Sequence, residues 1–409
     1  MSSNAIIGEP SRKRTRTSSS NAATDQQTVV IRHPVLWLDD GNIVLRTTSP
    51  ATVEAPTTQT LYRIHKSILA LNATFFEDMF AGGADVFDAA SEQCQGFPVI
   101  DMPDPAEDVE PFLKSIFVSN WMLDILRGCN ASNRAALFPA EFEPVLRLAT
   151  KYGATAIRQA AVEALQAAWP SSLAVWDKQQ GARRYAVNQA VVTSGSHFAS
   201  PEYICMLQAA VPRYYPNPVV ALRLAHDCDV PTILPVVYYA LAVAHGMRVP
   251  EDLLSAARKR SADLSGLSST EFTRLLDGLT RIQYKFMTDF RRIGFNEIHG
   301  DLVKSTCISP VQCSKSVKAW WKSQFDRSLE YSVRIAQDIL YYTSRAEEDY
   351  KEWVDEDETI RGENVCSHCL RRPAPLLAQF RQEFWESLPE MFDLSVLPLS
   401  IPFVVLGKL

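Results

Sequence analysis

The hydrophobic pattern of the chain is helical nearly everywhere after Asp104, and this constrains the fold more than any other feature. Asn42–Arg46 is a β-rich run, Thr60–Ile64 has apolar residues at alternate positions, and Phe97–Met102 is a further short strand candidate. From Asp104 onward the apolar positions recur every three or four residues, as on one face of a helix. The sequence therefore predicts an α+β fold, in which a small sheet flanked by helices precedes a mostly α-helical C-terminal region.

Local signals set the expected limits of several elements. Residues 47–59, full of Thr, Ser and Pro, predict a long hairpin loop between the first two strands. Thr74–Glu77 fits a capping box at the start of a helix. The periodicity of Val317–Tyr342 predicts one continuous helix.

The 409 residues are enough for two or three domains, at roughly 100–200 residues each. Residues 1–28 are rich in Ser, Thr, Asn and Gln and carry almost no large apolar side chains, so we expect a disordered tail. We place an α/β domain at residues 29–165 and the helical region at residues 170–409. The helical region could consist of two subdomains, at residues 170–295 and 300–409.

Charge and composition limit the classes of protein to which the chain can belong. The formal net charge of −6 gives the chain no overall attraction for nucleic acid or an anionic membrane, so either would need a local basic patch. The longest apolar run, Val236–Ala244, is short of the ~20 residues that cross a bilayer. Residues 1–27 lack the apolar part of an export signal, and the eight cysteines are too sparse for a disulfide scaffold. We therefore expect an intracellular protein, in the nucleus, the cytoplasm or both, that binds neither nucleic acid nor membrane.

One basic run lies in the N-terminal tail, where Arg12, Lys13, Arg14 and Arg16 place four cations in five residues. An acidic receptor groove could bind such a run, which makes it a candidate nuclear-import signal. The alternative interpretation is a basic tail that only increases solubility.

Several phrases in the N-terminal third are typical of one family. Asp40–Leu45 resembles its opening strand, Leu61–Ala70 its strand-to-helix passage with His65 in the signature position, and Phe76–Phe80 the aromatic end of its helical hairpin. From about residue 37 to 160 the chain resembles a BTB/POZ domain. The phrases Trp37–Leu45 and Arg223–Pro231 make it closest in form to mushroom-type (basidiomycete) fungal BTB proteins.

This resemblance implies a protein–protein interaction molecule that could associate with itself through the BTB domain. It also suggests a substrate adaptor that binds the cullin scaffold of a ubiquitin ligase. Such adaptors carry a hydrophobic-x-acidic triplet after the helical hairpin, and Val86, Phe87 and Asp88 occupy about that position. The alternative is a nuclear transcriptional co-regulator or scaffold that acts through self-association without direct DNA binding. The segment before Trp37 departs from the family, because it does not clearly give the first helix of dimeric members.

No motif indicates an enzyme. The chain has no phosphate-binding loop, zinc-protease helix or nucleophile elbow, so we expect no catalytic and no cofactor-binding residues. His65 has no nucleophile or carboxylate beside it in its motif, and we expect its ring to bond the backbone at a strand-to-helix corner. Asp40 is expected to bond backbone two residues further on, in a turn.

Two cysteine pairs are the only indication of metal chemistry. Cys366 and Cys369 have a spacing that lets two thiolates hold one Zn²⁺ from a tight turn, and Cys307 and Cys313 form a looser pair. If the chain between them doubles back, the four sulfurs could form one structural zinc site. A single helix across residues 317–342 would instead hold the pairs apart unless the following loop returned. Four ordinary thiols, or a redox pair, are the other interpretations.

Overall fold

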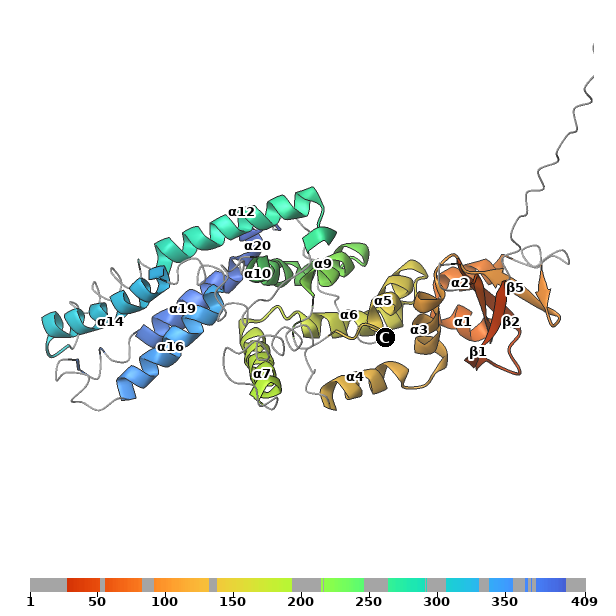
Figure 1. The fold of residues 1–409 in the computed structure, drawn as a ribbon, viewed down its shortest axis with the longest axis horizontal. Helices are drawn as coiled ribbons and strands as arrows, with labels where there is room; N and C mark the ends of the chain where they lie inside the picture. The colour runs from red at the N-terminus through yellow and green to blue at the C-terminus, as the bar shows by residue number, and fades with distance from the viewer. Residues whose placement is uncertain are drawn as a thin grey trace, which may run out of the picture. The chain divides into compact units, whose positions relative to one another are not determined.

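The computed structural model describes residues 28–51, 56–82, 92–131, 138–192, 215, 217–245, 264–290, 292, 307–330, 338–355, 365–366, 369 and 373–394 (Figure 1). Among these residues, strands occur only between Val29 and Asp101, and every later element is a helix. The predicted α+β class with a helical C-terminal region is therefore confirmed.

The chain separates into two compact units. One consists of Met1–His65 with Ala89–Ala106 and contains the sheet; the other consists of Lys66–Asp88 with Glu107–Leu409 and contains the helices. The domain limits that we placed at residues 29–165 and 170–409 stay predictions.

Five strands form the sheet, in the order β1-β3-β2-β5-β4. They are β1 (Val29–Trp37), β2 (Ile43–Ser49), β3 (Thr58–Ile64), β4 (Gln93–Cys94) and β5 (Phe97–Asp101). β2 and β3 form an antiparallel hairpin whose register runs from Ile43 opposite Ile64 to Ser49 opposite Thr58. The loop predicted for residues 47–59 is too long at both ends, because its threonines are β-branched and pair as strand residues.

β2 lies in the middle of the sheet, antiparallel to β3 and parallel to β5. Its consecutive residues Ile43, Val44 and Leu45 have no exposed area. Successive side chains of a strand point to opposite faces, so this central strand is covered on both.

The hydrophobic pattern did not predict β1, which pairs in parallel with β3. The pairing is irregular around Pro34, whose nitrogen has no hydrogen to donate. The ring of His33 stabilises this irregular part, because its Nδ1 accepts the backbone N–H of Val35 at 3.2 Å and of Leu36 at 2.9 Å. Most residues of β1 are exposed on both faces, so no alternation of apolar and polar side chains marks it as a strand.

Among the described residues, the helical unit begins with six helices, two of which contact Tyr152 at the end of a third. The six helices are α1 (Lys66–Asn72), α2 (Thr74–Ala81), α3 (Ala106–Phe117), α4 (Trp121–Ala131), α5 (Phe142–Lys151) and α6 (Thr155–Ala168). The Tyr152 ring lies 5.0 Å from the ring of Phe76 and 5.7 Å from that of Phe112, so α2, α3 and the end of α5 share a core. The capping box expected at Thr74 is wrong: Ala73 precedes α2 and makes no side-chain cap.

The C-terminal helices, together with α5 and α6, form one hydrophobic core that runs in sequence from Leu146 to Leu394. They are α7 (Leu173–Val192), α9 (Pro218–Asp227), η2 (Pro231–Ile233), α10 (Leu234–His245), η3 (Leu264–Gly266), α12 (Ser269–Lys285), η4 (Phe286–Phe290), α14 (Pro310–Glu330), α16 (Ile339–Asp355), α19 (Pro373–Glu386) and α20 (Leu388–Met391). None of the helices in the described part of the chain has both the length and the apolar character needed to cross a membrane.

The continuous helix predicted across residues 317–342 is wrong. α14 ends at Glu330, and the separate helix α16 begins at Ile339. Asp338 caps α16, because its Oδ1 accepts the N–H of Tyr341 at 3.2 Å and the buried hydroxyl of Tyr239 at 3.0 Å. Tyr239 belongs to α10, so this cap also fastens the start of α16 to the core.

Candidate metal centre

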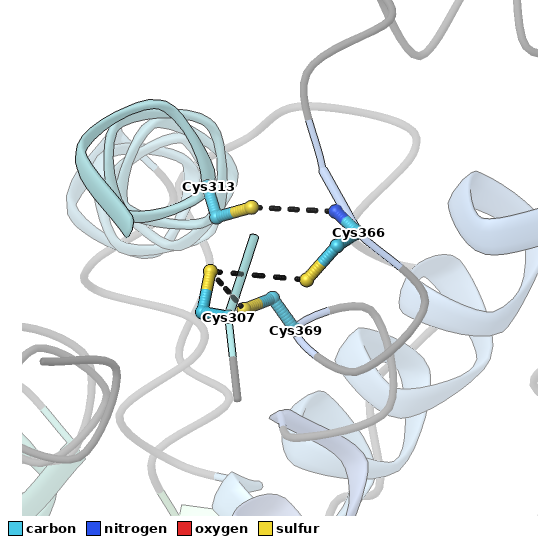
Figure 2. A group of neighbouring side chains, drawn as sticks. All are labelled: Cys307, Cys313, Cys366 and Cys369. Atoms are coloured by element: carbon cyan, nitrogen blue, oxygen red, sulfur yellow. Dashed lines mark hydrogen bonds between the residues drawn. The ribbon is translucent and has the colours of Figure 1, made fainter. Parts of the chain in front are cut away.

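Four cysteine side chains from two distant segments converge within the helical unit (Figure 2). Cys307 precedes α14, and Cys313 lies in the first turn of that helix. Cys366 and Cys369 lie between α16 and α19. Among the described residues between the pairs, α14 ends at Glu330 and the separate helix α16 begins at Ile339, so the second pair can come back beside the first.

The distances between the sulfur atoms suit a single ion. All four Sγ atoms lie within 4.8 Å of one another, and Cys307 Sγ is 3.4 Å from that of Cys369 and 3.8 Å from that of Cys366. A tetrahedral ion with metal–sulfur bonds of ~2.3 Å has sulfur–sulfur edges of ~3.8 Å. A disulfide needs about 2.05 Å, and the four cysteines are free thiols in this structure. The four cysteines could therefore hold one metal ion.

The chemistry of the donors narrows the kind of ion. Thiolates select soft or borderline metals, and a tetrahedral set of four sulfurs is typical of zinc or of iron–sulfur centres. In an iron–sulfur cluster the cysteines ligate different iron atoms, which separates their sulfurs further than one shared ion does. The close spacing of the four sulfurs here thus favours a mononuclear site. With four protein ligands, such a site has no open position for a substrate or an activated water.

Backbone N–H groups stabilise charge on the sulfurs. The N–H of Cys366 donates to Cys313 Sγ at 3.3 Å, as Figure 2 shows. Burial acts to raise the pKa of Cys366, but N–H donation from Cys369 and Ile308 and contacts with neighbouring thiols outweigh it and lower this pKa to about 6. One thiolate is thus available near neutral pH before any metal binds.

Two other members of the cluster resist ionisation without a metal. Burial is the main cause that raises the pKa of Cys313 and of Cys369, and the neighbouring thiols raise both further. A cluster of closely spaced thiols cannot carry several negative charges at once. A divalent cation would remove this obstacle, because it displaces the protons and neutralises the thiolates.

Aromatic packing fixes the helices that carry the two pairs. Trp321 of α14 is fully buried; its ring stacks on Phe290 at 4.9 Å, and its Nε1–H donates to the Phe290 carbonyl at 3.2 Å. Phe290 also lies 5.9 Å from Phe380 of α19. α14 and α19 are thereby held through a common neighbour, and the cysteines join the segments that precede or begin these helices.

The other predicted site residues are placed as follows. The triplet Val86, Phe87 and Asp88 and the basic run Arg12, Lys13, Arg14 and Arg16 lie outside the described residues, as does His368 within the second cysteine pair. The expected backbone bond of His65 and the expected turn bond of Asp40 are replaced by a contact between the two side chains, with Nε2 3.1 Å from Oδ1.

Sequence reasoning missed the N–H donors of the cluster, above all Ile308. The signal available was its position directly after Cys307, on the turn that the two cysteines of the first pair enclose.

Comparisons with known proteins do not assign the chain to a family. No family model matches the chain, and no curated protein or solved structure matches it significantly.

Proposed function

We propose that this chain is a non-enzymatic protein-interaction molecule whose helical region is closed by a structural zinc ion. The convergence of four thiol sulfurs within 4.8 Å carries the proposal. Cys307, Cys313, Cys366 and Cys369 are the ligands, and zinc is the ion because it accepts four thiolates in a closed tetrahedron without redox chemistry. Its role is to join the start of α14 to the segment before α19.

The position of the site supports a structural role. Cys313 and Cys369 are buried within the large hydrophobic core, and Cys307 and Cys366 pack against it. An ion here closes a loop of roughly fifty residues, which limits the freedom of the unfolded chain as a disulfide does. The ion would therefore contribute to the stability of the fold itself.

The interaction role draws on the BTB-like order of elements. A hairpin (β2, β3), a helix pair (α1, α2), a strand (β5) and the helix α3 follow one another in the order that the resemblance implies. The BTB resemblance supports association through this part of the chain and, as a narrower proposal, an adaptor role for a cullin-type ubiquitin ligase. In that role the chain would work in the cytoplasm or the nucleus.

Metal analysis of the full-length chain, purified without chelator, tests the zinc proposal. We expect one equivalent of zinc, bound in a form that a thiol-specific mercurial releases stoichiometrically. Less than about a tenth of an equivalent would refute the site. Stoichiometric iron with a coloured sulfur–iron spectrum would refute zinc as the ion while keeping the ligands.

A pull-down with a purified cullin scaffold tests the adaptor proposal separately. We expect binding at micromolar concentration, and its loss when Val86 and Asp88 are both changed to Ala while the circular dichroism spectrum stays the same. If the wild-type chain does not bind the cullin scaffold, the adaptor role is refuted, and the alternative role of a nuclear co-regulator gains support. Deletion of residues 1–27 should then move the protein from nucleus to cytoplasm, because the basic run would be its import signal.

A further inference from the structure

The turn between the first two cysteines exposes two aliphatic side chains. Ile308 is 87% exposed and Val311 is 85% exposed, which places them among the most exposed large apolar residues of the described chain. Their backbone is held from both sides, because Cys307 and Cys313 enclose the turn and the N–H of Ile308 donates to Cys366 Sγ. Neighbouring exposed apolar side chains, unlike a single one, mark an interaction site when polar or charged residues border them.

A row of lysines continues from this turn along α14. Val311, Lys315, Lys318 and Lys322 follow at i, i+4, i+7 and i+11, so they lie on one face of the helix. Lys315 and Lys322 are exposed, and Lys318 is half-buried. The part of α14 whose side chains are described, Pro310–Ser323, contains these three lysines and no acidic residue. This is a local basic patch on a chain whose net charge is −6.

We propose that this surface, made of Ile308, Val311, Lys315, Lys318 and Lys322, docks on an anionic lipid membrane. The two aliphatic tips would enter the boundary between headgroups and acyl chains, and the lysines would contact anionic headgroups. The proposal departs from our expectation that the chain does not bind membranes, which rested on its net charge and on the shortness of its apolar runs.

The chemistry of the surface favours lipid over other anionic partners. Nucleic acid would attract the lysines, but binding in its grooves or on single strands would use aromatic or hydrogen-bonding side chains instead of two aliphatic tips. A protein partner would need an apolar pocket with acidic surroundings. A bilayer needs no matching pocket, because it accepts convex apolar tips directly, and its charge lies just outside its apolar region.

Co-sedimentation of the zinc-loaded full-length chain with vesicles tests the proposal. One set of vesicles consists of phosphatidylcholine alone, and the other contains about 30% phosphatidylserine. We expect binding to the second set only, and its loss at about 0.5 M salt, where charge is screened. Ile308→Ser with Val311→Ser should reduce the bound fraction about tenfold, and so should Lys315→Gln with Lys318→Gln and Lys322→Gln.

Controls distinguish an effect of this surface from an effect of the metal site and from nonspecific binding by exposed apolar side chains. Tyr284→Ser removes another exposed apolar side chain, 71% exposed on α12, and should leave binding unchanged. Zinc content is measured for every variant. The lysine variant changes no residue between Cys307 and Cys313, so we expect it to keep its zinc. Failure of the zinc-loaded chain to bind anionic vesicles would overturn the proposal. So would equal binding to both vesicle sets, or full binding by either variant of the surface. If the purified chain contained no zinc but still bound anionic vesicles, the zinc proposal alone would be refuted.

Discussion

The sheet and the C-terminal helices are held together by different kinds of contact. In the sheet, β2 pairs with β3 directly across a hairpin, and β4 pairs with β5 across the two-residue turn Gln95-Gly96. In the helical region, Cys313 accepts a bond from Cys366, fifty-three residues later, and Tyr239 is bonded to Leu340, 101 residues later. Two of the four strand pairs are therefore local, and the other two join distant segments along continuous ladders (Val29 opposite Thr58 and Val44 opposite Val99), whereas the cysteine-bearing helices depend on distant segments meeting through side chains.

This difference predicts where the molecule is most vulnerable. Closing a long loop has an entropy cost that grows with loop length, so distant contacts need a strong interaction to hold them. The metal ion that we propose, held by four thiolates, would supply such an interaction at one point. Loss of that point should harm the helical region more than any single side-chain change in the sheet.

The largest effect should come from Cys369→Ser. This change removes a buried ligand, so we expect the chain to lose its zinc and more than about 3 kcal/mol of stability in the helical region. Denaturant unfolding together with metal analysis would measure both. Cys94→Ser is the matched control, because Cys94 lies in β4 outside the cluster; it should retain zinc and change stability by about 1 kcal/mol or less. Equal stability of the Cys369 variant and the wild type would show that no ion stabilises the fold.

Acid should release the ion, and the pKa of Cys366 sets the range. This pKa is lowered to about 6 in the folded chain, so the Cys366 thiolate favours the folded state at higher pH, and its contribution is lost as pH falls through about 6. Zinc requires the same thiolate. The number of protons released for each zinc bound should therefore rise as the pH falls through about 6. Titration with Co²⁺, followed by its thiolate absorption band, measures this; a constant proton number from pH 5 to 8 would contradict it.

In the sheet, Leu45→Ala should cost about 2–5 kcal/mol, because Leu45 is fully buried in the central strand and its truncation leaves a cavity. Zinc content should stay the same, since none of the four ligands lies in a strand. Denaturant unfolding and metal analysis of the same sample test the two statements. A loss below about 1 kcal/mol would mean that the site collapses around the cavity.

The same contrast explains which parts of the structure could be predicted from the sequence. The β2–β3 hairpin follows from a β-rich apolar run and a run with alternating apolar residues on either side of a polar stretch, a pattern contained within a short window. The spacing of Cys366 and Cys369 likewise marks a possible ligand pair. In both cases the residues that matter are near neighbours in sequence.

The remainder depends on distant contacts that no local pattern encodes. β1 pairs in parallel with β3 and is irregular at Pro34, so it carries no alternation to detect. The separation of α14 from α16 could not be predicted either, because residues 331–337 contain neither Gly nor Pro. The position of Asp338, which caps α16 and bonds Tyr239, is decided by the core. Because the sequence did not reveal that α14 and α16 are separate helices, the convergence of the two cysteine pairs could only be a hypothesis at that stage.

A smaller effect should come from the contact between α12 and the end of α20. A Cβ on Gly278 would come within 2.1 Å of ring carbons of Phe392, so Gly278→Ala should destabilise by about 1–3 kcal/mol through overpacking. Gly181→Ala is the matched control on α7, where a Cβ meets nothing within 4 Å. It should stabilise by about 0.5–1 kcal/mol, because alanine loses less backbone freedom on folding. Thermal unfolding compares the stability of the two variants. If Gly181→Ala also destabilised the chain, the helix propensity of alanine would not by itself account for the effect of this change in α7.

The smallest effect should come from the polar pair at the corner after β3. His65 and Asp40 are 3.1 Å apart, but the Asp40 side chain is 84% exposed. Water solvates this carboxylate in the folded and unfolded states alike, so Asp40→Ala should change stability by less than about 1 kcal/mol. His65→Ala removes a ring that is only 25% exposed and should destabilise more, through lost packing. A double-mutant cycle measures the coupling between the two side chains, which we expect at about 0.2–1 kcal/mol. A coupling above about 2 kcal/mol would show that the pair organises the corner, and that a polar contact in the sheet region can matter as much as a distant one among the helices.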